Sequence, residues 1–198
     1  MIYSLVETAD FYDPDNWIAT CKSNSNVAGT QLREAHHHLG FELAKTFWSE
    51  LHCGVVVCFM RGGLPFSLGI ADKLDCPILF YDDKNSPDFF ERNADQLCGR
   101  RVILVDSVIN SGKSMLKAVE KLKGISSDIK IATNVLCYKA IERFNSLETF
   151  TVRVSGNSFE GSNVKEQCGN KGPDTGDRLF KTQGFNIFKM SNTFNRAF

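Results

Sequence analysis

The 198-residue sequence predicts an α/β fold in which a parallel sheet is flanked by helices. Three observations predict it: short runs rich in valine and isoleucine recur along the chain, segments with a helical period lie between them, and 42% of the residues are hydrophobic. Strands that are buried on both faces are apolar without alternation, and strands that alternate with helices favour a parallel sheet with right-handed crossovers. The length suits one domain of this class.

The first part of the chain predicts an extension followed by one long helix. Residues 1–29 are polar and have no regular period, so we expect an irregular N-terminal extension before a domain over residues 30–198. Between residues 31 and 48 the apolar side chains recur with a helical period, and His36 falls on the same face. This pattern predicts a single amphipathic helix.

The next part predicts two strands with a helix between them. Residues 54–60 form a valine-rich run that Arg61-Gly62-Gly63 interrupts, and Pro65 can begin a helix that runs to Lys73. Residues 76–81 predict a weaker strand. Residues 82–96 are polar and have no clear period, so we expect a surface loop over the site.

The following segments continue the alternation. Residues 101–105 give the strongest strand prediction, and Gly124 can end the helix that comes next. The remaining predictions are a helix over 113–123, a strand over 129–137, a helix over 139–147, a strand over 150–154 and a loop over 155–178. Ligands bind at the carboxyl ends of parallel strands. The segments 61–63 and 106–114 each follow a strand directly, so we expect them on the same rim of the sheet.

Charge and cysteine content argue against several functions. The 23 basic and 23 acidic side chains cancel, so we expect no nucleic acid or membrane partner, and we interpret Lys117, Lys121 and Lys123 as a solvated helix face. The longest apolar run, residues 54–60, is far shorter than the roughly 18 residues of a membrane span. Seven cysteines without a C-x-x-C pair indicate free thiols, and the first residues lack the pattern of a secretory signal, so we expect a cytoplasmic protein.

The segment 102–114 carries the most chemical information. An apolar strand ends in Asp106, and a loop of small residues then begins a helix. Unpaired N–H groups and the helix dipole make such a start an anion site, and Gly112 lets the backbone approach a phosphate closely. Asp106 can accept from sugar hydroxyls or hold a hydrated metal ion. The side chains that can add to the anion site are Ser111, Lys113 and Ser114.

Two nucleotide chemistries and a plain strand–turn–helix compete for this segment. Gly112-Lys113-Ser114 fits the end of a Walker A loop, but Ser107 stands where that loop needs its first glycine. The alternative fits better: an apolar strand that ends in an acidic residue, followed by a small-residue loop, resembles the phosphoribosyl pyrophosphate (PRPP) signature of type I phosphoribosyltransferases.

Three further segments resemble uracil phosphoribosyltransferases. Residues 60–66 are similar to that family's Arg-Ala-Gly-Leu-Pro loop, and residues 172–182 look like its Gly-Asp-Ala-Gly-Asp-Arg-Tyr-Phe-Gly-Thr segment. Residues 30–34, with Leu39-Gly40 and Leu43-Ala44, match its early helix. The four matches occur in the family order, and Gly-Asp-Arg-x-Phe is the most specific of them.

The resemblance implies a reaction in pyrimidine salvage: uracil and PRPP give UMP and pyrophosphate. Magnesium accompanies the pyrophosphate donor, so we expect Mg²⁺ as a cofactor but no separate metal site made by the protein. The implied fold is a type I phosphoribosyltransferase-like sheet with a small hood built partly from the C-terminal segment. Homodimers or higher homo-oligomers are usual, and phenylalanines at 180, 185, 188 and 194 favour packing in an oligomer.

The resemblance also assigns roles to residues. Arg61 would contact the pyrophosphate, because a guanidinium suits paired phosphate oxygens. Asp106, facing the ribose hydroxyls, and Asp174, near the donor and base, would be the catalytic residues. Backbone at 173–175 and near Cys168 would read the uracil edge, and residues 110–114 would wrap the 5′-phosphate. The expected substrate-binding residues are Arg61, Gly62, Asp106, Ser107, Val108, Ile109, Asn110, Ser111, Gly112, Lys113, Ser114, Cys168, Pro173, Asp174 and Thr175.

Several positions depart from the family pattern. Ser107 replaces a proline, Asn110 an alanine and Lys113 a glycine, while Pro173 replaces a glycine whose N–H faces uracil. The family's Arg-Asp-Glu-Glu-Thr loop has no clear partner in residues 81–85. These changes preserve phosphate recognition better than uracil recognition. A catalytically silent homologue that binds a nucleotide or PRPP therefore stays open, as does a 6-oxopurine phosphoribosyltransferase, which has a similar Thr-Gly-Lys-Thr.

Overall fold

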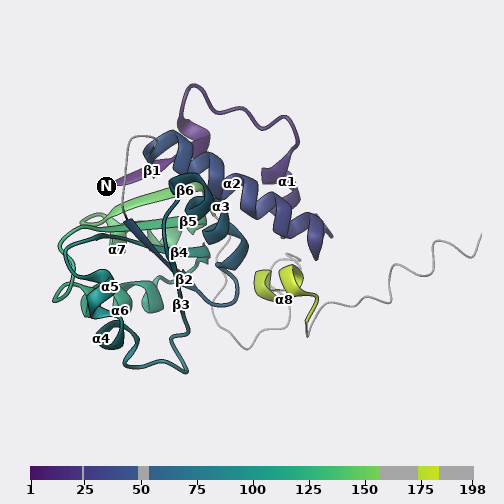
Figure 1. The fold of residues 1–198 in the computed structure, drawn as a ribbon. Coiled ribbons are helices and arrows are strands. Elements are labelled where there is room, and N and C mark those ends of the chain that lie inside the picture. Colours follow the sequence, from purple (N-terminus) through teal and green to yellow (C-terminus); the bar gives the residue numbers. More distant parts are fainter. Residues whose placement is uncertain (24, 49–53, 157–173, 183–198) are drawn as a thin grey trace, which may run out of the picture.

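A computed structural model of the chain contains a six-stranded sheet in which every pair of neighbours is parallel (Figure 1). The structure describes residues 1–23, 25–48, 54–156 and 174–182. The strand order is β1-β6-β5-β4-β2-β3. The strands are β1 (Ile2–Ser4), β2 (Gly54–Phe59), β3 (Ile78–Tyr81), β4 (Arg101–Ile109), β5 (Ile129–Cys137) and β6 (Glu148–Ser155). The predicted fold class is confirmed.

Helices cover both faces of the sheet and bury two apolar cores. Along β2, Val55 and Val57 face one core while Val56 faces the other, as the alternation of a strand requires. The helices α2 (Thr30–Trp48) and α3 (Leu64–Leu74) cover the face of Val56. The opposite face packs against α4 (Phe89–Arg92), α5 (Ala94–Leu97), α6 (Lys113–Leu122) and α7 (Ile141–Phe144).

The two helices over the Val56 face approach each other closely because glycines lie between them. A Cβ atom at Gly69 would lie 1.9 Å from the carbonyl oxygen of His37, and one at Gly40 would lie 2.2 Å from that of Phe66. The predicted long helix is confirmed as α2, and Pro65 lies at the start of α3 as expected. Close packing at this point fixes how α3, and the loop before it, sit on the sheet.

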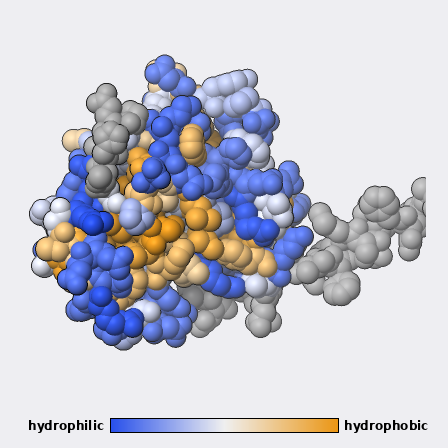
Figure 2. Space-filling model, viewed as in Figure 1, coloured by the Kyte–Doolittle hydropathy of each residue, from blue (hydrophilic) through white to orange (hydrophobic). Residues whose placement is uncertain are grey.

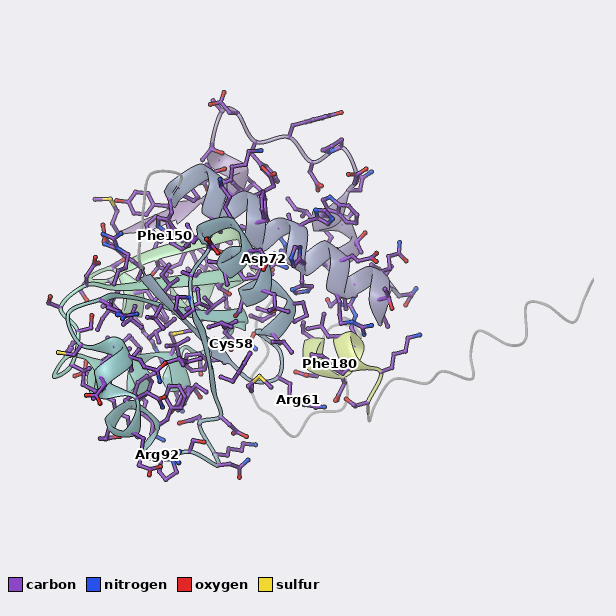
Figure 3. The ribbon with its side chains drawn as sticks, in the orientation of Figure 1. Cys58, Arg61, Asp72, Arg92, Phe150 and Phe180 are labelled. Carbon is purple, nitrogen blue, oxygen red and sulfur yellow. The ribbon has the colours of Figure 1, made fainter. Side chains whose placement is uncertain are left out.

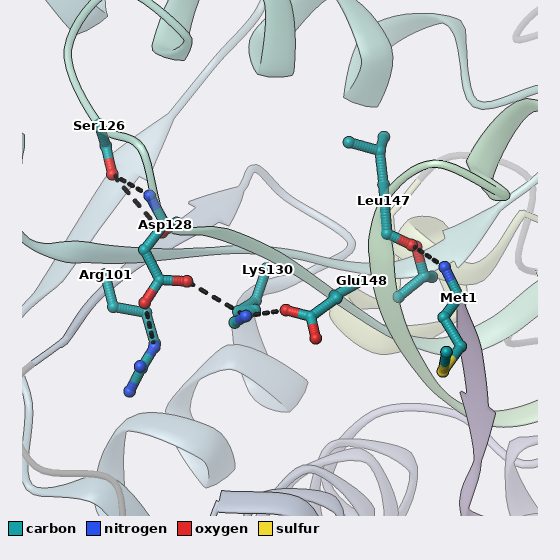
Figure 4. A network of polar contacts seen from close by, with 8 residues as sticks. Met1, Arg101, Ser126, Asp128, Lys130, Leu147 and Glu148 are labelled. Carbon is teal, nitrogen blue, oxygen red and sulfur yellow. Dashed lines mark hydrogen bonds and ion pairs between the residues drawn. The ribbon is translucent and has the colours of Figure 1, made fainter.

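The N-terminal segment is not irregular throughout, so that prediction is wrong for two parts of it. Strand β1 adds an edge to the sheet and aligns Tyr3 with Phe150, and α1 (Trp17–Cys21) packs on α2. A 3-10 turn, η1 (Leu5–Glu7), follows β1. The backbone nitrogen of Met1 donates to the carbonyl oxygen of Leu147 at 2.8 Å, at the amino end of the sheet (Figure 4).

The segment 82–96 differs from the predicted open loop. It contains α4 and most of α5, and two of its apolar side chains, Phe89 and Phe90, are buried, as is Leu97 at the end of α5. Two lysines of α6 hold it. Lys117 pairs with Asp83 at 3.0 Å, and Lys121 donates to the carbonyl oxygen of Pro87. These lysines are therefore partners of the segment and not only a solvated face.

Smaller differences concern element boundaries. The predicted helix over 139–147 is a 3-10 turn, η2 (Tyr138–Ala140), followed by the single-turn α7. The helix α8 (Thr175–Phe180) begins inside the predicted loop over 155–178 and continues past its end. Lys123, in a right-handed conformation, ends α6, so Gly124 is not its cap. Strand β4 continues to Ile109, four residues past the predicted end.

The amino ends of the central strands carry an ion-pair network, away from the carboxyl ends where a ligand would bind (Figure 4). Asp128 accepts from Arg101 at 2.7 Å and from Lys130 at 3.2 Å, and Lys130 also pairs with Glu148. Figure 2 shows an apolar area on the face that displays β3 and α3, where Leu68 and Phe80 are exposed. Among the described residues, no helix has the length and apolar character needed to cross a bilayer.

Candidate functional site

The loops after β2 and β4 meet at one rim of the sheet. We call residues 60–63 the β2 loop and residues 110–112 the β4 loop. Strands β2 and β4 are direct neighbours, and the Ser107 hydroxyl donates to the carbonyl oxygen of Gly62 at 2.6 Å. A Cβ atom at Gly62 would lie 3.7 Å from an Asp106 oxygen, and one at Gly63 would lie 2.8 Å from the Val105 carbonyl oxygen. The expectation that both loops share a rim is confirmed.

The β4 loop is shorter than predicted because β4 extends beyond Asp106. Ser107, Val108 and Ile109 belong to the strand, and the side chains of Ser107 and Ile109 are buried. Only three residues then separate the strand from α6. Gly112 has φ +75°, and a Cβ atom there would lie 2.5 Å from the Phe144 ring. Glycine is therefore required both for the backbone turn and for the space.

The start of α6 presents exposed polar groups at this loop. Ser111, Lys113 and Ser114 are exposed, and Asn110 is half-buried. Arg143 of α7 donates to the carbonyl oxygen of Ser111 at 3.0 Å and holds the loop from that side. The arrangement has the backbone turn and the cations that an anion site at a helix start needs.

Asp106 has a perturbed carboxyl group. Burial raises its pKa to about 7, and the negative charge of Asp174 adds to this effect, although backbone N–H groups of Ser107 and Val108 bond to the carboxylate and act in the opposite direction. Near neutral pH the group is therefore present in both protonation states. A carboxyl group with such a pKa at the end of a parallel strand marks a candidate functional position.

Arg61 of the β2 loop points toward the C-terminal segment. Its guanidinium pairs with Asp177 at 3.3 Å and donates to the Thr182 hydroxyl at 3.3 Å. The Thr182 hydroxyl in turn donates to the same Asp177 oxygen at 2.6 Å. Figure 3 shows Arg61 beside α8, on the side of the labelled Phe180. The peptide bond between Met60 and Arg61 is cis.

The helix α8 brings the C-terminal motif to the same rim. Asp174 caps the helix by accepting from the backbone nitrogens of Gly176 at 2.8 Å and Asp177 at 3.3 Å. A Cβ atom at Gly176 would lie 3.9 Å from the Cα of Gly62, so the helix start and the β2 loop are in contact. Thr175 is half-buried next to Asp174. The other two expected base-binding residues, Cys168 and Pro173, lie outside the described residues.

The sequence did not predict the role of Arg178, the arginine of the Gly-Asp-Arg match. Arg178 is 1% exposed, and among the described residues its guanidinium donates to carbonyl and hydroxyl oxygens of the N-terminal segment: Thr20, Cys21, Ser25 and Val27. Burial lowers its pKa. Arg33 at the start of α2 donates to the carbonyl oxygen of Leu179 at 2.8 Å. The Gly-Asp-Arg match was the available signal, and here its arginine anchors α8 to the rest of the fold.

The turn after β3 places a carboxylate at the start of α6. Asp83 accepts from Tyr81 at 2.8 Å and from Lys117 at 3.0 Å. Burial acts to raise the pKa of Asp83, but hydrogen bonds from Lys117, Tyr81 and the Ser114 hydroxyl outweigh it, so the pKa lies below its ordinary value. Ser114, an expected phosphate ligand, thus already has an anionic partner.

Carboxylates at the rim suit a hydrated magnesium ion that a phosphate ligand also holds. Asp106 and Asp174 are close enough to interact electrostatically. Magnesium usually binds one or two carboxylates and substrate phosphates while it keeps several waters. Within the described ranges no group of three or more His, Cys, Asp and Glu side chains could hold a metal by itself. The residues present therefore fit an ion that arrives with a phosphorylated ligand.

Comparison with known proteins identifies the class. The phosphoribosyl transferase domain model matches residues 35–167, and the chain belongs to this family. The AQ2163 protein of Aquifex aeolicus has a similar structure with a TM-score of 0.62 at 18% identity, covering 91% of this chain and 98% of that one. A Neisseria gonorrhoeae protein solved with bound ppGpp has a TM-score of 0.50 at 18% identity, covering 62% and 80%.

Two relatives in sequence have different roles. The transcriptional regulator GfcR of Methanococcus maripaludis is 30% identical over 91 residues, which are 42% of this chain and 44% of that protein. The orotate phosphoribosyltransferase of Sulfolobus acidocaldarius is 30% identical over 101 residues, 50% of this chain and 51% of that protein. The chain thus spans about half the length of the relatives it matches.

Proposed function

We propose that this phosphoribosyltransferase-family protein transfers ribose 5-phosphate from PRPP to a pyrimidine base, with uracil as the first candidate, to give UMP and pyrophosphate. The observation that carries the proposal is the contact between the β2 loop and α8, made by Arg61 with Asp177 and by Gly62 with Gly176. These are two of the four segments that carry the resemblance to uracil phosphoribosyltransferases. Their contact supports the proposed reaction, because the resemblance assigns the pyrophosphate to one segment and the base to the other.

Each part of the rim has a role in this proposal. Arg61 turns from Asp177 to the pyrophosphate, and Asp106 accepts from the ribose hydroxyls. Backbone N–H groups of residues 110–114 hold the 5′-phosphate, and the resemblance assigns contact with the base to the backbone at residues 173–175 and near Cys168. Positive charge develops on the ribose as the pyrophosphate leaves, so placement of reactants and electrostatic stabilisation contribute more than a strong nucleophile.

Magnesium, where PRPP brings it, would be held by the carboxylates of Asp106 and Asp174. There it would neutralise charge on the leaving group. The protein's own contribution is the carboxylate pair, since Asp106 is held at the rim by backbone N–H groups of Ser107 and Val108. Removal of magnesium with EDTA should therefore abolish product formation.

The test is calorimetry followed by a product assay. PRPP with magnesium is titrated into the protein, and uracil, orotate, cytosine, hypoxanthine, guanine and adenine are then added in separate samples, with nucleotide measured by chromatography. UMP as the main product is the expected result. If a nucleotide forms from one other base and not from uracil, that base is the substrate in place of uracil. Saturable PRPP binding without product from any base would overturn the enzymatic reading.

A regulator that binds a nucleotide or PRPP without turnover is the second candidate. Asp83 supports it, because its carboxylate bonds to the Ser114 hydroxyl at the helix where a phosphate would bind. The relative named a transcriptional regulator makes the same suggestion for this family. Affinity for UMP above that for PRPP, with no turnover, would favour this candidate.

We also propose that the chain forms a homodimer or a higher homo-oligomer in the cytoplasm. Figure 2 shows an apolar area over β3 and α3, and each element has an exposed large apolar side chain: Phe80 on the edge strand β3 and Leu68 on α3. A large exposed apolar area on a sheet edge favours association. Size-exclusion chromatography with light scattering tests the mass in solution, and a monomer at micromolar concentration would refute it.

A further inference from the structure

A buried polar chain lies directly beneath the β2 loop. Ser107 and His36 are each 1% exposed, and they come from β4 and α2. The Ser107 hydroxyl lies 2.6 Å from the carbonyl oxygen of Gly62 and 3.1 Å from Nδ1 of His36. Asn134 of β5 lies 3.4 Å from the same nitrogen. Four elements of the fold thus meet in one set of hydrogen bonds behind the candidate donor site.

The protons of this chain can be assigned from its chemistry. The Gly62 carbonyl can only accept, and a serine hydroxyl has one proton, so Ser107 donates to Gly62. The contact between Ser107 and His36 must then run from Nδ1–H to the serine oxygen. Nδ1 therefore carries the proton of a neutral imidazole, and Nε2 is left bare. Nε2 has no hydrogen-bond partner among the described residues. An unprotonated nitrogen costs less to bury at this position than an unpaired N–H would, because the positive charge of Arg178 is nearby.

The same assignment fixes which atom of a neighbouring amide faces the imidazole. The Oδ1 atom of Asn134 has no partner in the described part of the chain, whereas its Nδ2 faces Nδ1 of His36. With a proton on Nδ1, the amide presents its oxygen there, because two donors cannot face each other. Burial, together with the charge of Arg178, lowers the pKa of His36 to about 3, so the neutral form persists across the physiological range.

We propose that His36 and Ser107 are positioning residues that fix the carbonyl of Gly62, and with it the β2 loop, in the geometry that receives the donor. This inference rests on the proposed function. Gly62 is the point where the loop meets both Asp106 and Gly176, so a rotated Gly62 peptide would disturb two sides of the site at once. Where the resembled family has proline, this chain has a serine that can make the hydrogen bond.

The variants Ser107→Ala and Ser107→Thr separate the hydroxyl from the space it occupies. Ser107→Ala removes the buried hydrogen bond to the Gly62 carbonyl and should weaken PRPP binding about three- to tenfold in calorimetry. Ser107→Thr keeps the hydroxyl and should bind within about twofold of the original protein. Ser126→Ala is the matched control: Ser126 is also buried and donates to a backbone carbonyl, that of Arg100 at 2.7 Å, but at the amino end of the central strands, opposite the candidate site. It should leave the affinity unchanged.

A spectroscopic measurement tests the proton assignment without any ligand. Long-range ¹H–¹⁵N correlation spectra of the full chain, assigned by the loss of signals in His36→Gln, should show Nδ1 protonated and Nε2 unprotonated from pH 5 to 8. A protonated Nε2 would overturn the inference. So would a Ser107→Ala protein that binds PRPP as tightly as the original.

Failure of the proposed function gives a different result. If the original protein does not bind PRPP, hydrogen exchange decides the positioning role alone. Backbone amides of residues 59–66 should exchange faster in Ser107→Ala and not in Ser126→Ala. Equal exchange in the two variants would overturn the inference, and faster exchange in Ser107→Ala alone would support it although the donor assignment had failed.

Discussion

The raised pKa of Asp106 predicts that neutralising this side chain stabilises the protein, and that the gain grows with pH. In the folded protein the pKa is about 7, against an ordinary value of 3.8. Because the folded value is the higher one, folding favours the neutral form. The stabilisation that the neutral Asp106 carboxyl provides is complete below pH 3.8 and is lost as the pH rises through 7.

The magnitude follows from the two pKa values. At about 1.36 kcal/mol per pKa unit, the difference sets an upper bound of about 4 kcal/mol on the destabilisation at pH 8, and of about 1.6 kcal/mol at pH 5. Asp106→Asn removes this term. Its amide oxygen still accepts from the backbone N–H groups, so any other cost of the substitution is the same at both pH values. The gain in free energy of unfolding should therefore increase by up to about 2.4 kcal/mol between pH 5 and pH 8.

Urea unfolding followed by circular dichroism measures the effect. The original protein and Asp106→Asn are compared at several pH values from 5 to 8 with linear extrapolation. Asp95→Asn, at an exposed position on α5, is the matched control for the replacement of a carboxylate by an amide. Parallel curves for Asp106→Asn and the original protein would refute the reasoning, because they would mean that burial does not hold the carboxyl in its neutral form.

Three further substitutions test other parts of the site. Gly112→Ala should destabilise the fold by at least about 1–2 kcal/mol in urea unfolding, because φ is positive there and the Phe144 ring fills the space; a neutral effect would contradict the loop geometry. Arg178→Met should cost about 2–4 kcal/mol by leaving buried carbonyl oxygens unpaired, and an unchanged stability would show that α8 is anchored otherwise. Asp177→Asn should tighten PRPP binding about two- to fivefold in calorimetry by removing the anion that competes for Arg61, and weaker binding would assign Asp177 a supporting role.

The alternation of strands and helices made the sheet predictable, and the rule for carboxyl ends made its rim predictable. Two loops that follow the valine-rich runs had to lie together once those strands were parallel neighbours. The pattern could not reveal β1, because three residues contain no period. That strand forms by pairing with β6, and its Tyr3 ring stacks on Phe150 at 4.8 Å. Such a pairing, across almost the whole chain, leaves no local signal.

The sequence also could not predict which way the side chains of the site point. Ser107 was expected among the substrate-binding residues, but β4 continues past Asp106, and alternation along the strand then turns the hydroxyl inward. His36 was placed on the buried face of its helix, yet its partners on β4 and β5 come from the packing of α2 on the sheet. The lysines of α6 were predicted to form a solvated face for a similar reason. Lys117 and Lys121 donate to acceptors in the segment after β3, 34 residues earlier in the chain, and that pairing leaves no local pattern in the sequence.

Carboxylates of the protein itself lie at the positions where a phosphate would bind, so a phosphate would have to displace them. Asp177 lies on Arg61, and Asp83 lies on Ser114 and Lys117. In the proposed function, donor binding would exchange a carboxylate for a phosphate, and only the difference between the two interactions would contribute to affinity. Thr182 lowers the cost of one exchange, because its hydroxyl donates to Asp177 at 2.6 Å and keeps that carboxylate hydrogen-bonded after Arg61 has turned to the ligand. The threonine that ends the matched Gly-Asp-Arg segment therefore holds Asp177 in place while Arg61 changes partners.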